Sequence, residues 1–187
     1  MEKRFKKTLI LDLDETLLHS TMFHIDRSPD FELGLAQAYL RPGLKVFIRS
    51  VFEWFETGIW TAATREYTMD AIARFINDPG RLLFIWSREQ CSMRTDKTTG
   101  EEYRIKDLSR VLALGHPVES IIVVDDDIRS WGDYRDNVVL VGKYRGNSED
   151  CDLPLLLSYL EILGSVQDVR AIDKKEWRQM AATAHKR

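Results

Sequence analysis

The sequence of 187 residues is poor in cysteine and lacks a long apolar run. Its two cysteines are too few for a disulfide framework, and they fit free thiols in a reducing compartment. No apolar run is long enough to cross a bilayer, and the N-terminal stretch lacks a signal-peptide pattern because its short apolar run soon meets acidic residues. We therefore expect a protein of the cytoplasm or nucleus with no membrane partner.

A surplus of positive charge is also absent. The chain has 27 lysines and arginines against 30 aspartates and glutamates, which gives a formal net charge of −3. General nucleic-acid binders usually carry a basic stripe, so we expect no general nucleic-acid binding. Neither cysteine lies in a glycine-rich phosphate loop, and the four histidines show no paired ligand spacing. The sequence therefore supports neither a cysteine nucleophile nor a zinc site.

Apolar segments alternate with helical patterns along most of the chain. Five runs are typical of buried strands: residues 8–13, 57–63, 81–87, 120–127 and 137–142. Apolar periodicity predicts helices over residues 41–55, 65–78, 106–114 and 152–166. Strands that alternate with helices in this way favour an α/β fold with a mostly parallel central sheet flanked by helices.

No linker, repeat or low-complexity tract divides the chain, so we expect residues 1–187 to form a single domain. Residues 19–40 and 88–104 look irregular, and each has room for a flap or hairpin but not for a large cap domain. Residues 166–187 are expected to form a C-terminal helix or tail.

Unusual polar residues stand where the predicted strands end. They are Asp12 and Asp14 after the first strand, Thr61 after the second, Asp125 and Asp126 at the fourth, and Lys106 near a later helix start. Ligands of open α/β sheets bind beyond the carboxyl ends of the strands. A single aspartate is commonly a turn or helix cap. Two acidic clusters with a hydroxyl and a lysine instead favour Mg²⁺ and a phosphoryl group.

The stretch "LDLDETLLHS" carries the D-x-D-x-T signature, and here the sequence resembles the haloacid-dehalogenase-type (HAD) phosphotransferases. The resemblance is greatest to the C-terminal-domain phosphatases of RNA polymerase II and their NLI-interacting-factor-like relatives, over about residues 8–165. It also includes "LRPG" at 40–43, "WTAATREY" at 60–67, "SREQC" at 87–91, "IKDLSRVL" at 105–112 and "VVDDDIRSW" at 123–131. It implies a HAD-like Rossmannoid fold with short insertions and no large cap domain.

The resemblance also implies how phosphate would be transferred. Asp12 would be the nucleophile that forms an aspartyl-phosphate, and Asp14 would act as general acid and then general base. Thr61 and Lys106 would hold the non-bridging phosphoryl oxygens. Thr16 is expected to support the turn, and Glu15 to point to solvent.

The metal site implied by the resemblance is a Mg²⁺ site. Its ligands would be the Asp12 carboxylate, the Asp14 backbone carbonyl and the Asp125 carboxylate. Asp126 would support the site either directly or through water. The acid at position 126 resembles the residue found there in the larger polymerase-tail phosphatases, whereas the small enzymes carry asparagine at this position. The chain is nevertheless too short for the additional phosphopeptide-binding domain of those larger enzymes.

Two further residues have open roles. Arg88 resembles a substrate-contacting arginine of the family, and a surface arginine that pairs with Glu89 or another neighbour is an equal alternative. Tyr67 either lines the substrate pocket or packs beside the helix that it begins.

Together these features predict a Mg²⁺-dependent phosphomonoesterase with an aspartyl-phosphate intermediate. Because no large lid is expected to enclose a metabolite, we expect phosphoserine or phosphothreonine on a protein or peptide as the substrate. The alternatives are a phosphatase of nucleotides, nucleic-acid ends or small phosphoesters, and a catalytically silent binding relative. The silent relative is disfavoured because the predicted catalytic residues are all present. The organism, the physiological substrate and the oligomeric state stay open.

Overall fold

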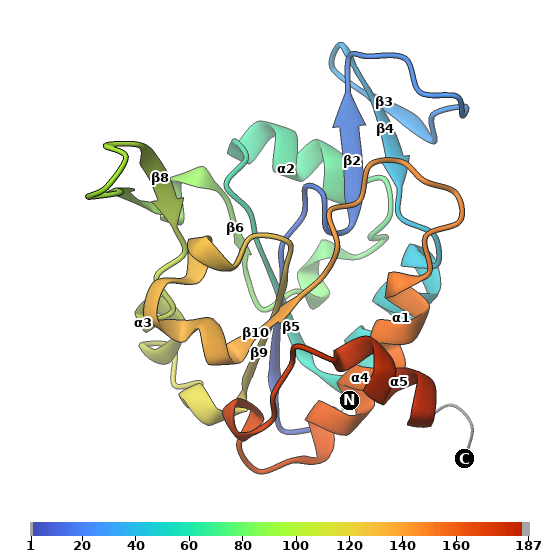
Figure 1. Cartoon of the computed structure of the whole chain (residues 1–187). Coiled ribbons are helices and arrows are strands. Elements are labelled where there is room, and N and C mark those ends of the chain that lie inside the picture. The colour runs from blue at the N-terminus through green and yellow to red at the C-terminus, as the bar shows by residue number, and fades with distance from the viewer. Residues whose placement is uncertain (1, 185–187) are drawn as a thin grey trace.

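The computed structural model describes residues 2–184, and residues 185–187, with one of the four histidines and the end of the predicted tail, lie outside this range. Its centre is a parallel sheet with strand order β10-β9-β1-β5-β6 (Figure 1). The strands are β1 (Thr8–Leu11), β5 (Glu56–Trp60), β6 (Ile85–Trp86), β9 (Ile121–Asp125) and β10 (Val138–Leu140). The predicted α/β class with a parallel central sheet is confirmed.

Strand β1 lies in the middle of this sheet and pairs in parallel with both β5 and β9. Leu9 and Leu11 contact the apolar core on one face, while Ile10 contacts the core on the other. All residues of β1 are buried, as expected for a continuous apolar run between two layers of helices.

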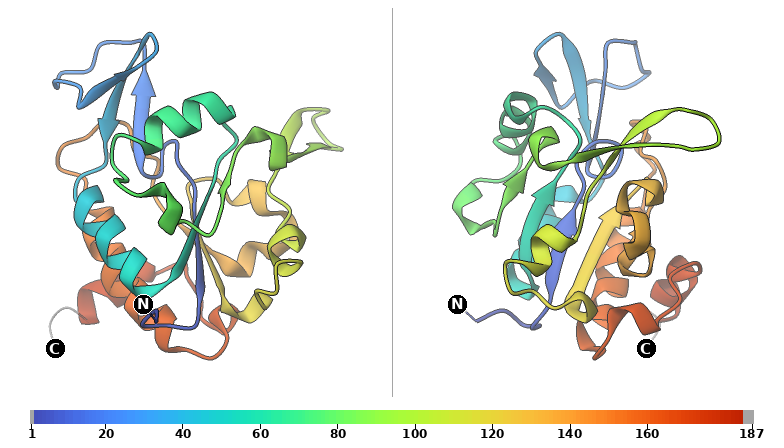
Figure 2. Two further views of the ribbon diagram at one scale, coloured as in Figure 1. Left: turned by 180° about the vertical axis from the view of Figure 1, so that it is seen from behind. Right: turned by 90° about the vertical axis from the view of Figure 1, so that its left-hand side faces the viewer.

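Helices cover both faces of the sheet (Figure 2). One face packs against α1 (Leu44–Trp54), α2 (Arg65–Ile72), α4 (Asp152–Ser165) and α5 (Trp177–Ala184). The other face packs against α3 (Ser109–Leu112) and the 3₁₀ segment η4 (Ile128–Asn137). Short 3₁₀ turns are η1 (Pro79–Arg81), η2 (Arg88–Gln90), η3 (Val118–Ser120) and η5 (Val169–Ala171).

Three predicted elements are shorter than expected. The strand predicted over 81–87 is limited to β6, because the 3₁₀ turn η1 occupies its start and β6 is an edge strand that pairs only with β5 in the part of the chain that the structure describes. The helix predicted over 65–78 ends at Ile72, since the next residues form i→i−3 hydrogen bonds such as Phe75 N to Ile72 O at 3.1 Å. The helix predicted over 106–114 is limited to α3.

The two irregular segments form small antiparallel insertions. The first is a flap of β2 (Leu18–Thr21), β4 (Ala36–Leu40) and β3 (Phe31–Leu33), in that spatial order. The second is a hairpin of β7 (Ser92–Thr95) and β8 (Glu102–Ile105). Figure 1 shows both on the upper side of the molecule, beyond the ends of the central strands. They flank the edge at which the predicted site residues end their strands.

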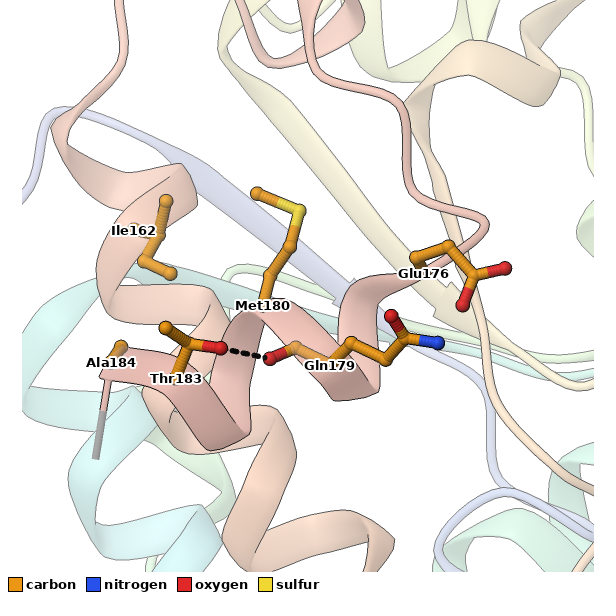
Figure 3. A pocket seen from close by; sticks show the side chains of 6 residues that line it. All are labelled: Ile162, Glu176, Gln179, Met180, Thr183 and Ala184. Atoms are coloured by element: carbon orange, nitrogen blue, oxygen red, sulfur yellow. Dashed lines mark hydrogen bonds between the residues drawn. The ribbon is translucent and has the colours of Figure 1, made fainter. Parts of the chain in front are cut away.

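The C-terminal helix α5 packs against α4 at the opposite end of the molecule. A hollow of about 640 Å³ lies beside it, lined by Ile162, Glu176, Gln179, Met180, Thr183 and Ala184 (Figure 3). None of the predicted site residues lines this hollow. Among residues 2–184, no helix has the length and apolar character needed to cross a membrane.

Candidate active site

The turn at residues 12–17 follows β1 and carries both aspartates of the D-x-D-x-T motif. Asp12 N donates to Val124 O at 3.0 Å, which extends the pairing with β9 by one residue. Glu15 then takes a left-handed backbone conformation, with φ of 61°, which is uncommon for a residue other than glycine. Its carbonyl accepts a hydrogen bond from Tyr144 N at 2.7 Å. This contact holds the turn in place over the carboxyl edge of the sheet.

Three carboxylates from the ends of neighbouring strands converge at this edge. Asp12, Asp125 and Asp126 each offer one oxygen, and these oxygens all lie within 4.8 Å of one another. Asp12 and Asp125 are buried, and Asp126 is half-buried. The parallel pairing of β1 with β9 brings these residues together although more than one hundred positions separate them.

Lys106 lies between two of these acids. Its ammonium donates to Asp12 Oδ1 and to Asp125 Oδ2, each at 2.6 Å, and it is buried. Burial alone would lower the pKa of Lys106, but the two carboxylates outweigh it and raise that pKa above its ordinary value. The two carboxylates therefore favour the charged form of Lys106 inside the acidic cluster.

The acidic cluster holds more negative charge than Lys106 balances. Burial and the neighbouring Asp125 raise the pKa of Asp12 well above its usual range, and Lys106 only partly opposes them. Burial and Asp125 likewise raise the pKa of Asp126, whose Oδ2 lies 3.4 Å from the exposed Lys143 ammonium. Three converging carboxylate oxygens with unbalanced charge fit a hard divalent cation, so the chemistry of the donor set suits a metal.

Asp14 lies beside this cluster and has its own hydrogen-bond partners. Its Oδ1 accepts from the Tyr67 hydroxyl at 2.5 Å, and its Oδ2 accepts from Thr61 Oγ1 at 3.3 Å. Burial raises the pKa of Asp14, while the bonds from Tyr67 and Thr61 oppose the rise. The Tyr67 hydroxyl also lies 2.8 Å from Ser20 Oγ of the flap. Tyr67 thus lies beside the site, in contact with the motif itself.

Thr16 and Glu15 both stabilise the turn. Thr16 Oγ1 donates to Asp126 Oδ1 at 3.2 Å, in keeping with its expected supporting role. The expectation that Glu15 points to solvent is wrong, because its carboxylate lies 2.7 Å from His19 Nδ1 and 3.2 Å from Arg145 Nε. The hydrogen bond with His19 and the ion pair with Arg145 hold the side chain of a residue whose backbone conformation is already unusual.

Arg88 is fixed by the backbone beside Thr61. Its Nε donates to the Ala62 carbonyl at 3.1 Å. Glu89 accepts from Ser87 Oγ at 2.5 Å, and no ion pair joins it to Arg88 in the described part of the chain. Arg88 is exposed and does not pair with Glu89 among the described residues, and its bond to Ala62 places it next to Thr61. Its contact with substrate stays a prediction.

Two partners of the site were not predicted from the sequence. Trp131 Nε1 donates to Asp125 Oδ2 at 2.8 Å. Arg41 is buried and donates to the Thr16 carbonyl at 3.0 Å, while it also pairs with Asp150 and Asp152. The only sequence signals are the arginine in "LRPG" and the tryptophan shortly after "VVDDD". Neither pattern predicts which oxygen accepts the hydrogen bond.

Comparison with known proteins gives consistent matches. A family model described as NLI interacting factor-like phosphatase matches residues 7–170. A probable C-terminal domain small phosphatase of Dictyostelium discoideum is 34% identical over 175 residues, which cover 89% of this chain and 53% of that relative. Human carboxy-terminal domain RNA polymerase II polypeptide A small phosphatase 1 is 29% identical over 175 residues, 89% of this chain and 63% of the relative. This chain thus spans only part of these relatives.

Solved structures share the fold at low sequence identity. A variant of the fission yeast RNA polymerase II CTD phosphatase Fcp1, bound to beryllium fluoride, matches with a TM-score of 0.55 and 16% identity. The match covers 96% of this chain and 50% of that one. A second Fcp1 structure matches with a TM-score of 0.53 and 19% identity, over 96% of this chain and 61% of that one. These neighbours support the HAD-like fold.

Proposed function

We propose that this chain, which belongs to the NLI interacting factor-like phosphatase family, hydrolyses phosphoserine or phosphothreonine in protein substrates. The observation that carries the proposal is the convergence of Asp12, Asp125 and Asp126, the first two of which pair with Lys106, with Asp14 beside them. This arrangement combines a nucleophile, a cation site and a proton donor at one edge of the sheet.

Mg²⁺ is the proposed cofactor, because it prefers oxygen ligands and one or two carboxylates. Oxygens of Asp12, Asp125 and Asp126, with the Asp14 carbonyl, would hold it. When bound, it supplies positive charge that keeps these acids ionised and neutralises the phosphoryl oxygens.

The reaction would proceed in two steps carried by the two aspartates of the motif. In the first, an Asp12 oxygen forms a bond to phosphorus as the bond to the serine or threonine oxygen breaks, and Asp14 gives that oxygen a proton. In the second, Asp14 takes a proton from a water whose oxygen attacks phosphorus. This step releases inorganic phosphate and restores the Asp12 carboxylate. The raised pKa of Asp14 suits it to the first step, since burial favours its protonated form.

Lys106, Thr61 and Arg88 would hold the substrate. Lys106 and the Thr61 hydroxyl lie within hydrogen-bond distance of Asp12 and Asp14 respectively, so both are close to where phosphate must bind. The guanidinium of Arg88 is held through Nε by the Ala62 carbonyl, and its other N–H groups, which have no hydrogen-bond partner among the described residues, would be available to bind the substrate phosphate.

A protein substrate is favoured over a small metabolite by the two insertions. The flap and the hairpin stand on either side of the edge, and residues 2–184 contain no large cap to close over it. The names of the human and yeast relatives refer to the polymerase C-terminal domain, a protein tail. We further propose that the protein acts in the cytoplasm or nucleus.

The test is phosphate release by the purified protein from phosphopeptides, nucleotides and 3′- or 5′-phosphorylated oligonucleotides. We expect the phosphopeptides to be the best substrates, with turnover abolished by chelator and restored by Mg²⁺. Asp12→Asn should be inactive while its circular dichroism spectrum is unchanged. Equal turnover with and without chelator would contradict the dependence on a metal. Residual activity of more than a few per cent in Asp12→Asn would contradict Asp12 as the nucleophile. Faster turnover of nucleotides than of phosphopeptides would contradict the proposed substrate class.

A further inference from the structure

Trp131 is a buried residue of η4 with a polar contact to the acidic cluster. Its indole is fully buried in the core on the η4 face of the sheet and meets the Trp60 ring edge to face at 5.6 Å between centroids. Its Nε1 donates to Asp125 Oδ2 at 2.8 Å, and the Lys106 ammonium lies 5.3 Å from its ring centre. The Trp131 side chain therefore contacts both Asp125 and the Lys106 ammonium.

The hydrogen bonds of Asp125 are unevenly divided between its two oxygens. Oδ2 accepts from both Lys106 Nζ and Trp131 Nε1, at 2.6 and 2.8 Å. Within residues 2–184, Oδ1 accepts only from Asp127 N, at 2.7 Å. A carboxylate has about four lone-pair positions, two on each oxygen. Oδ2 is therefore saturated, and the one remaining acceptor position belongs to Oδ1.

We propose, on the basis of the proposed function, that Trp131 is a positioning residue that restricts Asp125 to binding the metal through a single oxygen. Mg²⁺ requires a near-octahedral shell and accepts carboxylates through one oxygen. Ca²⁺ takes more ligands and readily binds both oxygens of one carboxylate. By saturating Oδ2 together with Lys106, Trp131 selects the smaller ion.

Trp60 provides an internal comparison. It belongs to the same apolar cluster and is equally buried, but its Nε1 has no hydrogen-bond partner among the described residues. A purely packing role would make the two tryptophans equivalent. The direct bond to Asp125 distinguishes Trp131.

The test uses Trp131→Phe, which keeps an aromatic ring and removes the N–H, with Trp60→Phe as the matched control. Mg²⁺ and Ca²⁺ dissociation constants are measured by calorimetry on metal-free protein, together with urea unfolding. In Trp131→Phe we expect Mg²⁺ binding to weaken by about tenfold, the typical loss for an outer-sphere contact, and Ca²⁺ binding to change by less than about threefold. In Trp60→Phe the ratio of the two constants should stay at the wild-type value.

The positioning role is overturned if Trp131→Phe weakens Mg²⁺ and Ca²⁺ binding equally. It is also overturned if Trp60→Phe changes the ratio of the two dissociation constants as much as Trp131→Phe does. If the wild-type protein binds Mg²⁺ and Trp131→Phe binds both ions with the wild-type dissociation constants, the positioning role is overturned while the proposed function is left intact. Failure of the wild-type protein to bind Mg²⁺ overturns both. If Trp131→Phe does not fold, the wild-type indole N–H signals are followed by ¹H–¹⁵N NMR. The Trp131 signal should then shift more on Mg²⁺ addition than that of Trp60, and a smaller or equal shift overturns the role.

Discussion

The Tyr67 hydroxyl lies 2.5 Å from Asp14 Oδ1 and 2.8 Å from Ser20 Oγ, so it joins the proposed proton donor to strand β2 of the flap. Proton transfer by a positioned acid contributes about 10²- to 10⁴-fold to a rate, and part of that contribution depends on orientation. We expect Tyr67→Phe to lower kcat by about tenfold, less than Asp14→Asn does, since the acid itself remains. Steady-state kinetics on a phosphopeptide measures this.

The matched control for Tyr67 is Tyr159→Phe. Tyr159 is a buried tyrosine, whereas Tyr67 is half-buried, and the Tyr159 hydroxyl has no hydrogen-bond partner among the described residues. Its removal should leave kcat unchanged. An equal fall in both variants would mean that Tyr67 acts only through general packing.

Lys106→Met should destabilise the metal-free protein. The change leaves Asp12 and Asp125 buried without their shared cation, and breaking a buried ion pair costs about 3–5 kcal/mol. Added Mg²⁺ should restore part of this loss, because it supplies positive charge to the same carboxylates. Urea unfolding with chelator and with Mg²⁺ measures the effect, and turnover should be lost in both conditions.

Lys174→Met separates this effect from the removal of any buried lysine. The Lys174 ammonium donates to the carbonyls of Asp136, Val169 and Ile172 and has no carboxylate partner among the described residues. Its loss of stability should be the same with and without Mg²⁺. A Mg²⁺-dependent loss in this variant would contradict the charge argument.

Arg178→Gln should lower the free energy of unfolding by about 1.5–3 kcal/mol, the range for hydrogen bonds to charged groups. Arg178 donates to both oxygens of the buried Asp152, at 2.7 and 2.6 Å. The control is Arg170→Gln, whose ion pair with Asp168 is solvent-exposed and should contribute little. Equal effects of the two changes would show that the burial of the Asp152 carboxylate makes no difference to the strength of these bonds.

The stability that Asp152 contributes should depend on pH in a defined direction. Burial alone would raise the pKa of Asp152, but the bonds and charge of Arg178, with Gly142 N and Arg41, hold it below its ordinary value of 3.8. A carboxyl group whose pKa is depressed in the folded state stabilises the fold at pH values above its ordinary pKa. This contribution is lost as the pH falls through the depressed pKa.

The measurement is the difference in unfolding free energy between the wild-type protein and Asp152→Asn, between about pH 6 and pH 2.5. We expect a wild-type advantage at pH 6 that shrinks below about pH 4. The difference between the two proteins removes the titration of other acids. A constant difference would contradict the depressed pKa.

Most of the central sheet was predictable because continuous apolar runs determine it. Residues 8–11 and 121–125 carry such runs, and the rule that ligands bind at carboxyl ends placed Asp12 beside Asp125. The edge strand β6 was overestimated, because the apolar residues of 81–87 include Leu83, which is partly exposed. The segment η4 was missed because 3₁₀ turns lack the 3.6-residue period.

The individual partners of the site residues could not be predicted. Lys106 was expected to bind phosphate, but its position between Asp12 and Asp125 depends on how β8 approaches the sheet. Similarly, the bond from Tyr67 to Asp14 depends on the side-chain rotamers of both residues. Sequence patterns identify which residues gather at an edge, whereas tertiary packing decides which atoms meet.

The buried arginine of the "LRPG" segment has a consequence for where the protein can be shortened. Asp152 receives hydrogen bonds from both Arg41 and Arg178, and Arg41 in turn holds the Thr16 carbonyl of the catalytic turn. The region matched by the family model ends at residue 170, before Arg178. A truncation there would keep every proposed catalytic residue, yet it would remove one of the two cations that balance Asp152. The hydrogen bonds that hold Asp152 thus extend beyond the region that the family model matches.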